Sequence, residues 1–253
     1  MLVVVSPAKK LDFESEIPSF KTSEPKFLDK SSVLIKSLRK TPADEISKLM
    51  KLSDALTKLN VDRYKSFSTP FNDENARAAI YAFMGDTYVG LDARSLKKSD
   101  VKYAQKHLRI LSGLYGLLGP LDLIQPYRLE MGTRFACAGS KNLYEFWKSD
   151  LTKELNKDLK GSEYLVNCAS NEYSSAIDFS KLEANVITPV FKEKKNDAYK
   201  VVGLFAKRAR GMMARYIVEN KITKLNELKK FSQDGYTFRS DLSKENELVF
   251  TRG

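Results

Sequence analysis

Four side chains in separate parts of the chain could carry acid–base chemistry. They are Lys9 near the amino terminus, Glu130 in the middle, and the adjacent Glu172 and Tyr173. A lysine, two carboxylates and a tyrosine can exchange protons with a bound substrate if the fold brings them together. Each could instead be a turn residue or an ion-pair partner, and the sequence has no nucleophile–base signature. We leave enzymatic activity open, take these residues as catalytic candidates, and favour a non-catalytic protein.

A second set of side chains could bind an anion. In a helical projection of residues 205–220, one face carries the cations Lys207, Arg208, Arg210 and Arg215. Gly211 and Ala214 lie among them, and the opposite face is apolar. Small residues between cations would let a phosphate approach the helix closely. The alternative is an ordinary amphipathic surface helix whose glycine packs against a neighbouring segment.

A glycine-spaced turn joins two apolar segments within residues 107–132, HLRILSGLYGLLGPLDLIQPYRLEMG. Glycine lets the backbone turn sharply and approach a ligand closely. We interpret this stretch as a helix-hairpin-helix-like element with Gly113 and Gly116 in its turn. Lys106 and Arg109 precede the turn and Arg128 follows it, which would allow contact with a nucleic-acid phosphate. A tight helix–helix connection that fills the core explains the segment equally well.

The charge balance of the chain favours an anionic partner. In 253 residues there are 43 Lys and Arg against 32 Asp and Glu, a net charge of +11. Nucleic acid is the first partner to consider for such a protein, although a lysine-rich, solubilising surface is an equal alternative. We expect DNA, bound mainly through its phosphate backbone with weak sequence preference. The competing hypothesis is an enzyme that acts on a phosphorylated or nucleotide-like small molecule in the same basic cleft.

Few residues could hold a metal or direct the chain to a membrane. His107 is the single histidine, and Cys137 and Cys168 lie far apart outside any CxxC pattern. This spacing gives no zinc site and fits buried thiols in a reducing cytosol. The apolar run Leu2–Val5 is too short for a signal peptide, and no stretch approaches membrane-spanning length. We expect no metal, no cofactor and no membrane contact in a cytoplasmic, monomeric protein.

Strands and helices intermix along the chain and would position these side chains. Ser6 and Lys9 follow a predicted strand at Leu2–Val5, and Ser170 and Glu172 follow another at Tyr164–Cys168. Further strands are predicted at residues 186–191, 199–205, 236–238 and 248–250. Helices are predicted from Pro42, over residues 72–83, from Ser99 into the glycine turn, around residues 143–155, and over residues 205–220. The pattern indicates one compact mixed α/β domain over residues 1–253, with helices around a central mixed sheet.

Several motifs, taken in order, give the chain a family resemblance. They are SPAKKLDF at residues 6–13, GDTYVGL at 85–91, the long segment at 107–132, LYEFW at 143–147, NCASNEY at 167–173, FAKRARGMMARYIVEN at 205–220 and ELVFTR at 247–252. In these motifs the chain resembles the YaaA peroxide-stress proteins over essentially its whole length. One departure is Gly119, where the resemblance leads us to expect an arginine before Pro120.

The resemblance carries its own expectations about function. It implies protection from hydrogen peroxide through lower levels of unincorporated intracellular iron. It also implies DNA binding in a positively charged cleft with a helix-hairpin-helix element. The fold it implies is an unusual α/β arrangement with helices packed around a central sheet. On this hypothesis Lys9, the turn at residues 107–132 and the cations of residues 207–215 line one cleft and bind the nucleic acid.

Overall fold

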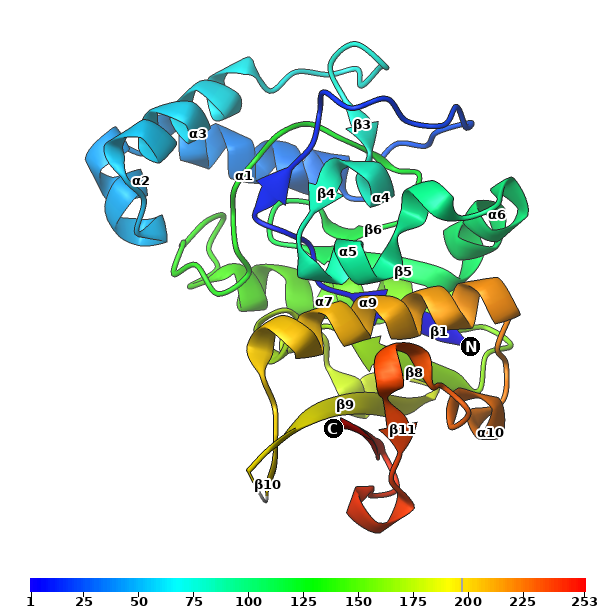
Figure 1. Ribbon diagram of the computed structural model, residues 1–253. Helices are drawn as coiled ribbons and strands as arrows, with labels where there is room; N and C mark the ends of the chain where they lie inside the picture. The colour runs from blue at the N-terminus through cyan, green and yellow to red at the C-terminus, as the bar shows by residue number, and fades with distance from the viewer. Residues whose placement is uncertain (197) are drawn as a thin grey trace.

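In the residues that the computed structural model describes, 1–196 and 198–253, eight strands form one mixed sheet through the middle of the molecule (Figure 1). The strands lie in the order β11-β12-β9-β8-β1-β5-β6, and β10 pairs with β9. Their bounds are β1 (Leu2–Val5), β5 (Leu108–Ser112), β6 (Gly116–Leu118), β8 (Tyr164–Cys168), β9 (Asn185–Lys195), β10 (Ala198–Lys200), β11 (Thr237–Phe238) and β12 (Glu247–Arg252). The expected fold class, a mixed α/β protein with a central mixed sheet, is confirmed.

The first strand of the chain occupies the centre of this sheet. β1 pairs in parallel with β5 on one side and with β8 on the other. β9 and β12 continue the parallel part of the sheet beyond β8. A strand covered on both faces needs an unbroken apolar run, and the LVVV sequence of β1 supplies one that is almost fully buried.

The connections leave β1 and β8 in opposite directions. After β1 the chain passes through several helices and returns as β5 on one side of β1. β5 and β6 form an antiparallel hairpin, and the chain then crosses through α7 to β8 on the other side of β1. β1 and β8 therefore flank a topological switch point. In open α/β sheets, ligands bind beyond the carboxyl ends of the strands at such a point.

Helices surround the sheet (Figure 1). α9 crosses one face and contacts β1, β8 and β9. The bounds are α1 (Leu28–Lys40), α2 (Ala43–Met50), α3 (Asp54–Ser66), α4 (Ala79–Ala82), α5 (Asp86–Leu91), α6 (Lys98–His107), α7 (Leu143–Asp158), α8 (Asn171–Ser174), α9 (Gly203–Asn220) and α10 (Leu225–Leu228). The helices predicted after Pro42, around residues 143–155 and over residues 205–220 are confirmed, whereas the helix predicted from Ser99 into the glycine turn ends at His107, where strand β5 begins. The expectation of a single domain stays a prediction.

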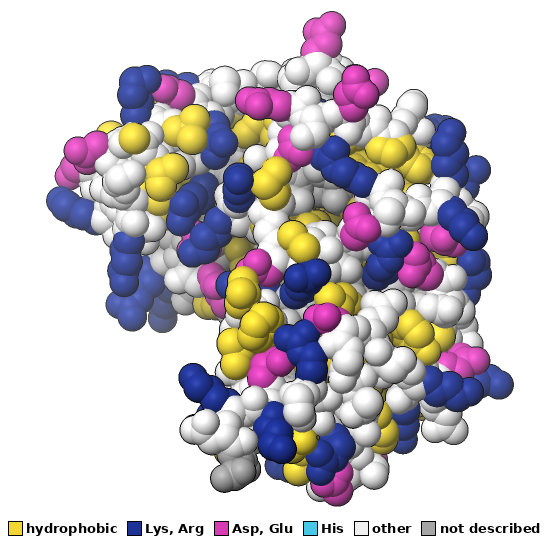
Figure 2. All heavy atoms as spheres, in the orientation of Figure 1, with side chains coloured by type: hydrophobic (Ala, Val, Ile, Leu, Met, Phe, Trp, Pro, Cys, Tyr) yellow, Lys and Arg dark blue, Asp and Glu magenta, His cyan; other side chains and the backbone are white. Residues whose placement is uncertain are grey.

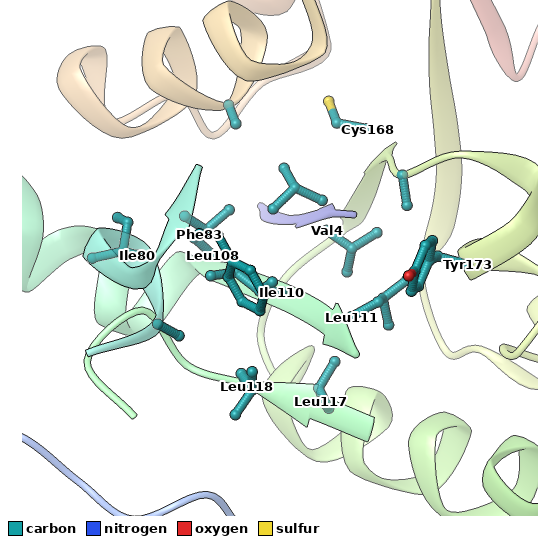
Figure 3. Close-up of a cluster of buried hydrophobic side chains, with 14 of the residues drawn as sticks. Val4, Ile80, Phe83, Leu108, Ile110, Leu111, Leu117, Leu118, Cys168 and Tyr173 are labelled. Atoms are coloured by element: carbon teal, nitrogen blue, oxygen red, sulfur yellow. The ribbon is translucent and has the colours of Figure 1, made fainter. Parts of the chain in front are cut away.

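The core gathers around β1 and the β5–β6 hairpin. Figure 3 shows Val4, Leu108, Ile110 and Leu118 in this cluster. Cys168 and Tyr173, from β8 and the segment after it, are labelled in the same cluster (Figure 3). The polar segment after β8 therefore begins directly at the core, which gives its side chains a rigid base.

The helix predicted over residues 72–83 is wrong. The segment forms β3 (Arg77–Ala78), the single turn α4 and β4 (Phe83–Met84) instead. β3 pairs with β7 (Leu123–Ile124), and β4 pairs with β2 (Lys10–Leu11). The N–H groups of Ala79 and Ile80 donate to the carbonyls of Asp122 and Pro120. Hydrogen bonds to a distant segment thus replace the local bonds that a helix would need.

The strand predicted over residues 199–205 is also mostly wrong. β10 covers Ala198–Lys200, and α9 already begins at Gly203. Among the described residues, β10 pairs with β9 alone and lies at the end of a hairpin that extends from the sheet (Figure 1). Val201 and Val202 connect β10 to α9, and Leu204 and Phe205 already belong to the helix.

The helix-hairpin-helix expectation for residues 107–132 is wrong as well. Leu108–Ser112 is strand β5, and Gly116–Leu118 is its antiparallel partner. A Cβ at Gly113 would lie 2.2 Å from the carbonyl oxygen of Leu129, and one at Gly116 would lie 2.7 Å from the Trp147 ring. Gly116 also has a φ of +70°. These glycines allow close packing inside the core, so the turn cannot present its backbone to a phosphate.

Candidate functional site

A pocket of about 300 Å³ lies beyond the carboxyl ends of β1 and β8. The two strand ends are joined through serines, because the N–H of Ser170 donates to Oγ of Ser6 at 2.9 Å. The pocket thus opens at the switch point of the sheet, where the topology favours a ligand site. The residues used below come from four segments and include Ser6, Lys9, Asp86, Thr87, Cys168, Ser170, Glu172, Tyr173, Lys207 and Arg210.

The structure brings the four acid–base candidates together at this pocket. Lys9, Glu172 and Tyr173 line it. Nζ of Lys9 lies 3.0 Å from Oε2 of Glu130, whose other oxygen lies 3.1 Å from Nη2 of Arg128. Arg128 and Glu130 therefore form an ion pair with each other. This pair fixes the carboxylate that holds Lys9 at the edge of the pocket.

The backbone after Arg128 also supports the pocket. Oε1 of Glu172 accepts a hydrogen bond from the N–H of Gly132 at 3.1 Å. A Cβ at Gly132 would lie 3.1 Å from that same oxygen. The end of the 107–132 segment is thus part of the site, although its glycine turn is not. The segment contributes through Glu130 and Gly132.

Two buried tyrosines lie beside the pocket and stay protonated. Burial raises the pKa of Tyr173 well above its usual value, and the nearby Tyr127 and Glu172 raise it further. Burial likewise raises the pKa of Tyr88, whose hydroxyl donates to the carbonyl of Ser6 at 3.2 Å. A tyrosine in such a state can donate a hydrogen bond or a proton but does not act as a base near neutral pH.

α9 places two cations at the pocket, Lys207 and Arg210. Arg210 is half-buried, and burial lowers the pKa of its guanidinium. In residues 1–196 and 198–253, neither side chain forms an ion pair with a carboxylate. A partly desolvated guanidinium without a carboxylate partner attracts an anion.

Other cations predicted for the same cleft lie elsewhere. Arg109 pairs with Asp158 at 2.7 Å. Lys106 and Arg109 flank the amino end of β5, whereas the pocket lies at the carboxyl ends of the parallel strands. Arg215 pairs with Glu219 at 2.7 Å and donates to the carbonyl of Asp92 at 2.7 Å, so it caps the end of α5. These arginines stabilise the fold.

The small residues of α9 do not leave an open surface between cations. A Cβ at Gly211 would lie 1.8 Å from the carbonyl oxygen of Thr87. A Cβ at Gly90 would lie 2.0 Å from the carbonyl oxygen of Arg208. α5 and α9 therefore touch backbone to backbone, and Ala214 is fully buried. The alternative of a glycine packed against a neighbouring segment is the correct one, and the side chain of Arg208 stays exposed.

Sequence reasoning missed Asp86 and Thr87, which line the pocket from the start of α5. Both belong to the GDTYVGL motif that carried the resemblance. Gly85 directly before them was the available signal, because a Cβ there would lie 3.2 Å from Cβ of Ala8 in the segment after β1. Gly85 directly before Asp86 was thus the sequence signal that this segment approaches the backbone after β1 closely.

Cys168 is expected to resist oxidation in the folded protein. Burial raises the pKa of its thiol to about 12, despite the nearby Arg210, so only about one thiol in a hundred thousand is ionised at neutral pH. In a Cys137→Ser variant, hydrogen peroxide should modify Cys168 no faster than the protein unfolds. Mass spectrometry of the intact protein, with and without denaturant, measures this. Rapid stoichiometric oxidation of the native variant would contradict it.

Within 1–196 and 198–253, no group of three or more His, Cys, Asp or Glu side chains is arranged to hold a metal ion. Over the same residues, no helix has the length and apolar character needed to cross a membrane.

The sheet and its pocket define a mixed α/β protein with a candidate site at a topological switch point. The chain belongs to the YaaA peroxide stress protein family, because the family model described as "Peroxide stress protein YaaA" matches residues 1–242. Family membership makes this a protein related to peroxide stress. It agrees with the resemblance seen in the sequence motifs.

Relatives match the chain from end to end. A UPF0246 protein of Saccharophagus degradans is 53% identical over 254 residues, which cover 100% of this chain and 99% of the relative. A UPF0246 protein of Aliivibrio fischeri is 52% identical, with 100% and 98% covered. One of Idiomarina loihiensis is 51% identical with the same coverage.

Proposed function

We propose that the switch-point pocket binds a small phosphorylated or nucleotide-like anion. The observation that carries this proposal is the pair of cations from α9, Lys207 and Arg210, which face the pocket without a carboxylate partner in the described residues. A guanidinium matches two phosphoryl oxygens at once, and a lysine adds a point charge beside it. Lys9 is a third cation that could turn from Glu130 to the ligand, since it lies at the rim.

The same pocket holds groups for proton transfer. Glu172 uses one oxygen to accept from Gly132, which leaves the other oxygen for a ligand. Tyr173, with its raised pKa, supplies a proton donor beside it. A carboxylate acceptor and a phenol donor next to an anion site suit an enzyme that acts on a bound phosphorylated compound. We link this activity to the peroxide-stress response of the family.

Calorimetric titration tests the proposal with inorganic phosphate, ribose 5-phosphate and AMP as probes. We expect binding by the wild type and at least tenfold weaker binding by Arg210→Gln, because a hydrogen bond to a charged group contributes about 1.5–3 kcal/mol. Arg208→Gln is the matched control, since Arg208 lies on the same helix, is exposed and does not line the pocket. Equal losses in both variants would indicate non-specific charge attraction and overturn the proposal.

Duplex DNA is the second candidate, favoured by the exposed cations outside the pocket. Figure 2 shows Lys and Arg side chains over this face, with Asp and Glu side chains between them. α2 and α3 are joined by a short turn, residues 51–53, in which Lys51 has a φ of +51°. In this second candidate, the turn and the exposed Arg208 contact phosphates of the DNA backbone.

Fluorescence anisotropy with a labelled duplex at two salt concentrations tests this second candidate. Backbone contacts predict affinity that falls steeply with salt and depends little on sequence. Lys51→Gln should weaken DNA binding while leaving the binding of ribose 5-phosphate unchanged. The lowering of unincorporated iron stays a separate prediction, which electron paramagnetic resonance of whole cells with and without the protein measures.

A further inference from the structure

The pocket contains charges of both signs that do not pair with each other. Lys207 and Arg210 line it from α9, Lys10 from β2, Asp86 from α5 and Glu172 from α8. Within residues 1–196 and 198–253, none of these five side chains takes part in an ion pair. In the same described part of the chain, these charged groups make a single hydrogen bond, which Glu172 accepts from the N–H of Gly132.

Charged side chains elsewhere in the protein are more often paired with a side chain of opposite charge. Most partly buried arginines outside the pocket have carboxylate partners, as Arg109 has in Asp158 and Arg252 in Glu193, whereas Arg63 donates to the amide oxygen of Asn60 at 3.2 Å. At the rim of the pocket, Lys9 and Glu130 also neutralise each other. The pocket thus holds five charged side chains without ion-pair partners in the described residues, three basic and two acidic.

Opposite charges held apart in one pocket favour a ligand that itself carries both signs. Arg210 and Asp86 are partly buried, which costs them hydration that no ion-pair partner in the described residues offsets, while Lys207 and Glu172 are exposed at the pocket. An anionic group would satisfy Lys207 and Arg210, and a protonated amine would satisfy the free oxygen of Glu172 and the carboxylate of Asp86. A purely anionic ligand would leave both acids unpaired and would be repelled by them.

We infer that the ligand of this pocket is a small zwitterion, with a phosphoryl group bound by Lys207 and Arg210 and a protonated amine bound by Glu172 and Asp86. The inference rests on the proposed function and specifies its ligand class. A volume of about 300 Å³ suits a small metabolite, at the lower end of the range of ligand pockets.

Matched ligand pairs test the inference. Aminoalkyl phosphates of three chain lengths are titrated by calorimetry against the alkyl phosphates that lack the amine. The wild type should bind at least one amine-bearing compound about tenfold or more tightly than its counterpart. Glu172→Gln and Asp86→Asn should each reduce this preference while retaining the binding of the plain alkyl phosphate. Glu183→Gln, an exposed acid outside the pocket, should leave the preference unchanged.

The outcomes separate the inference from the proposed function. Binding of alkyl phosphates with no gain from the amine at any chain length overturns the zwitterion and leaves the anion pocket intact. A preference that survives in both acid variants also overturns it, because the amine then binds elsewhere. Absence of binding by every phosphate compound overturns both. Circular dichroism of each variant verifies that a lost preference does not reflect unfolding.

Discussion

Gly211→Ala is expected to lower the free energy of unfolding by about 3 kcal/mol, near the upper end of what overpacking usually costs. The new Cβ would lie 1.8 Å from the carbonyl oxygen of Thr87 and 2.8 Å from the backbone nitrogen of Leu91. Both are backbone atoms, so no flexible side chain can yield. Either α5 or α9 must move, and both line the candidate pocket. In thermal unfolding the midpoint should fall by roughly 6–12 °C.

Gly203→Ala is the matched control on the same helix. No heavy atom lies within 4 Å of a Cβ built at Gly203, so this change adds no clash. Alanine also favours the helix over glycine by about 1 kcal/mol in a helix interior, and by less at the helix start. Gly203→Ala should therefore unfold at or slightly above the wild-type temperature. Equal stability of the two variants would refute the backbone contact between α5 and α9.

Trp147→Ala is expected to lower the free energy of unfolding by about 4 kcal/mol. Trp147 is fully buried on α7 and packs edge-on against Phe27 and Phe146. Its Nε1–H donates to the carbonyl of Gly113 at 2.9 Å, in the glycine turn between β5 and β6. The substitution leaves a cavity and an unpaired carbonyl. Urea unfolding followed by circular dichroism measures the loss.

Trp147→Phe separates these two contributions. It keeps most of the packing and removes the hydrogen bond to Gly113, so we expect a loss of about 2 kcal/mol. If phenylalanine proves as damaging as alanine, packing around the indole contributes little and the bond to the turn dominates. If phenylalanine costs nothing, the bond to the turn does not stabilise the fold.

The sequence predicted those elements whose pattern matches their final environment. Leu2–Val5 is an unbroken apolar run and becomes a strand buried on both faces. The apolar spacing of α7 and α9 likewise matches their docked faces. Leu108–Ser112 misled the prediction because four of its five residues are buried, and such a run fits a buried helix as well as a strand. Pairing with β1, far away in the sequence, decides the outcome.

The sequence predicted several residues of the candidate site but not which cations lie there together. Lys9 and Glu172 were recognised because polar residues follow predicted strands, and parallel pairing of β1 with β8 brings them together. Arg109 and Arg215 look the same in sequence as Arg210. What separates them is the partner, since Asp158 and Glu219 neutralise the first two. Glu219 lies four residues after Arg215 on the same helix, which is a local signal, whereas the pairing of Arg109 with Asp158 is decided by the tertiary fold.

The central position of β1 has a consequence for how the protein is made. Residues 2–5 leave the ribosome well before their partners in the sheet, Leu108–Ser112 and Tyr164–Cys168. At a synthesis rate of roughly 5–20 residues per second, this apolar strand waits on the order of ten seconds for its second neighbour. During that time it is exposed to aggregation unless a chaperone covers it. A nascent chain stalled before Tyr164 would hold an uncovered edge at what becomes the middle of the sheet.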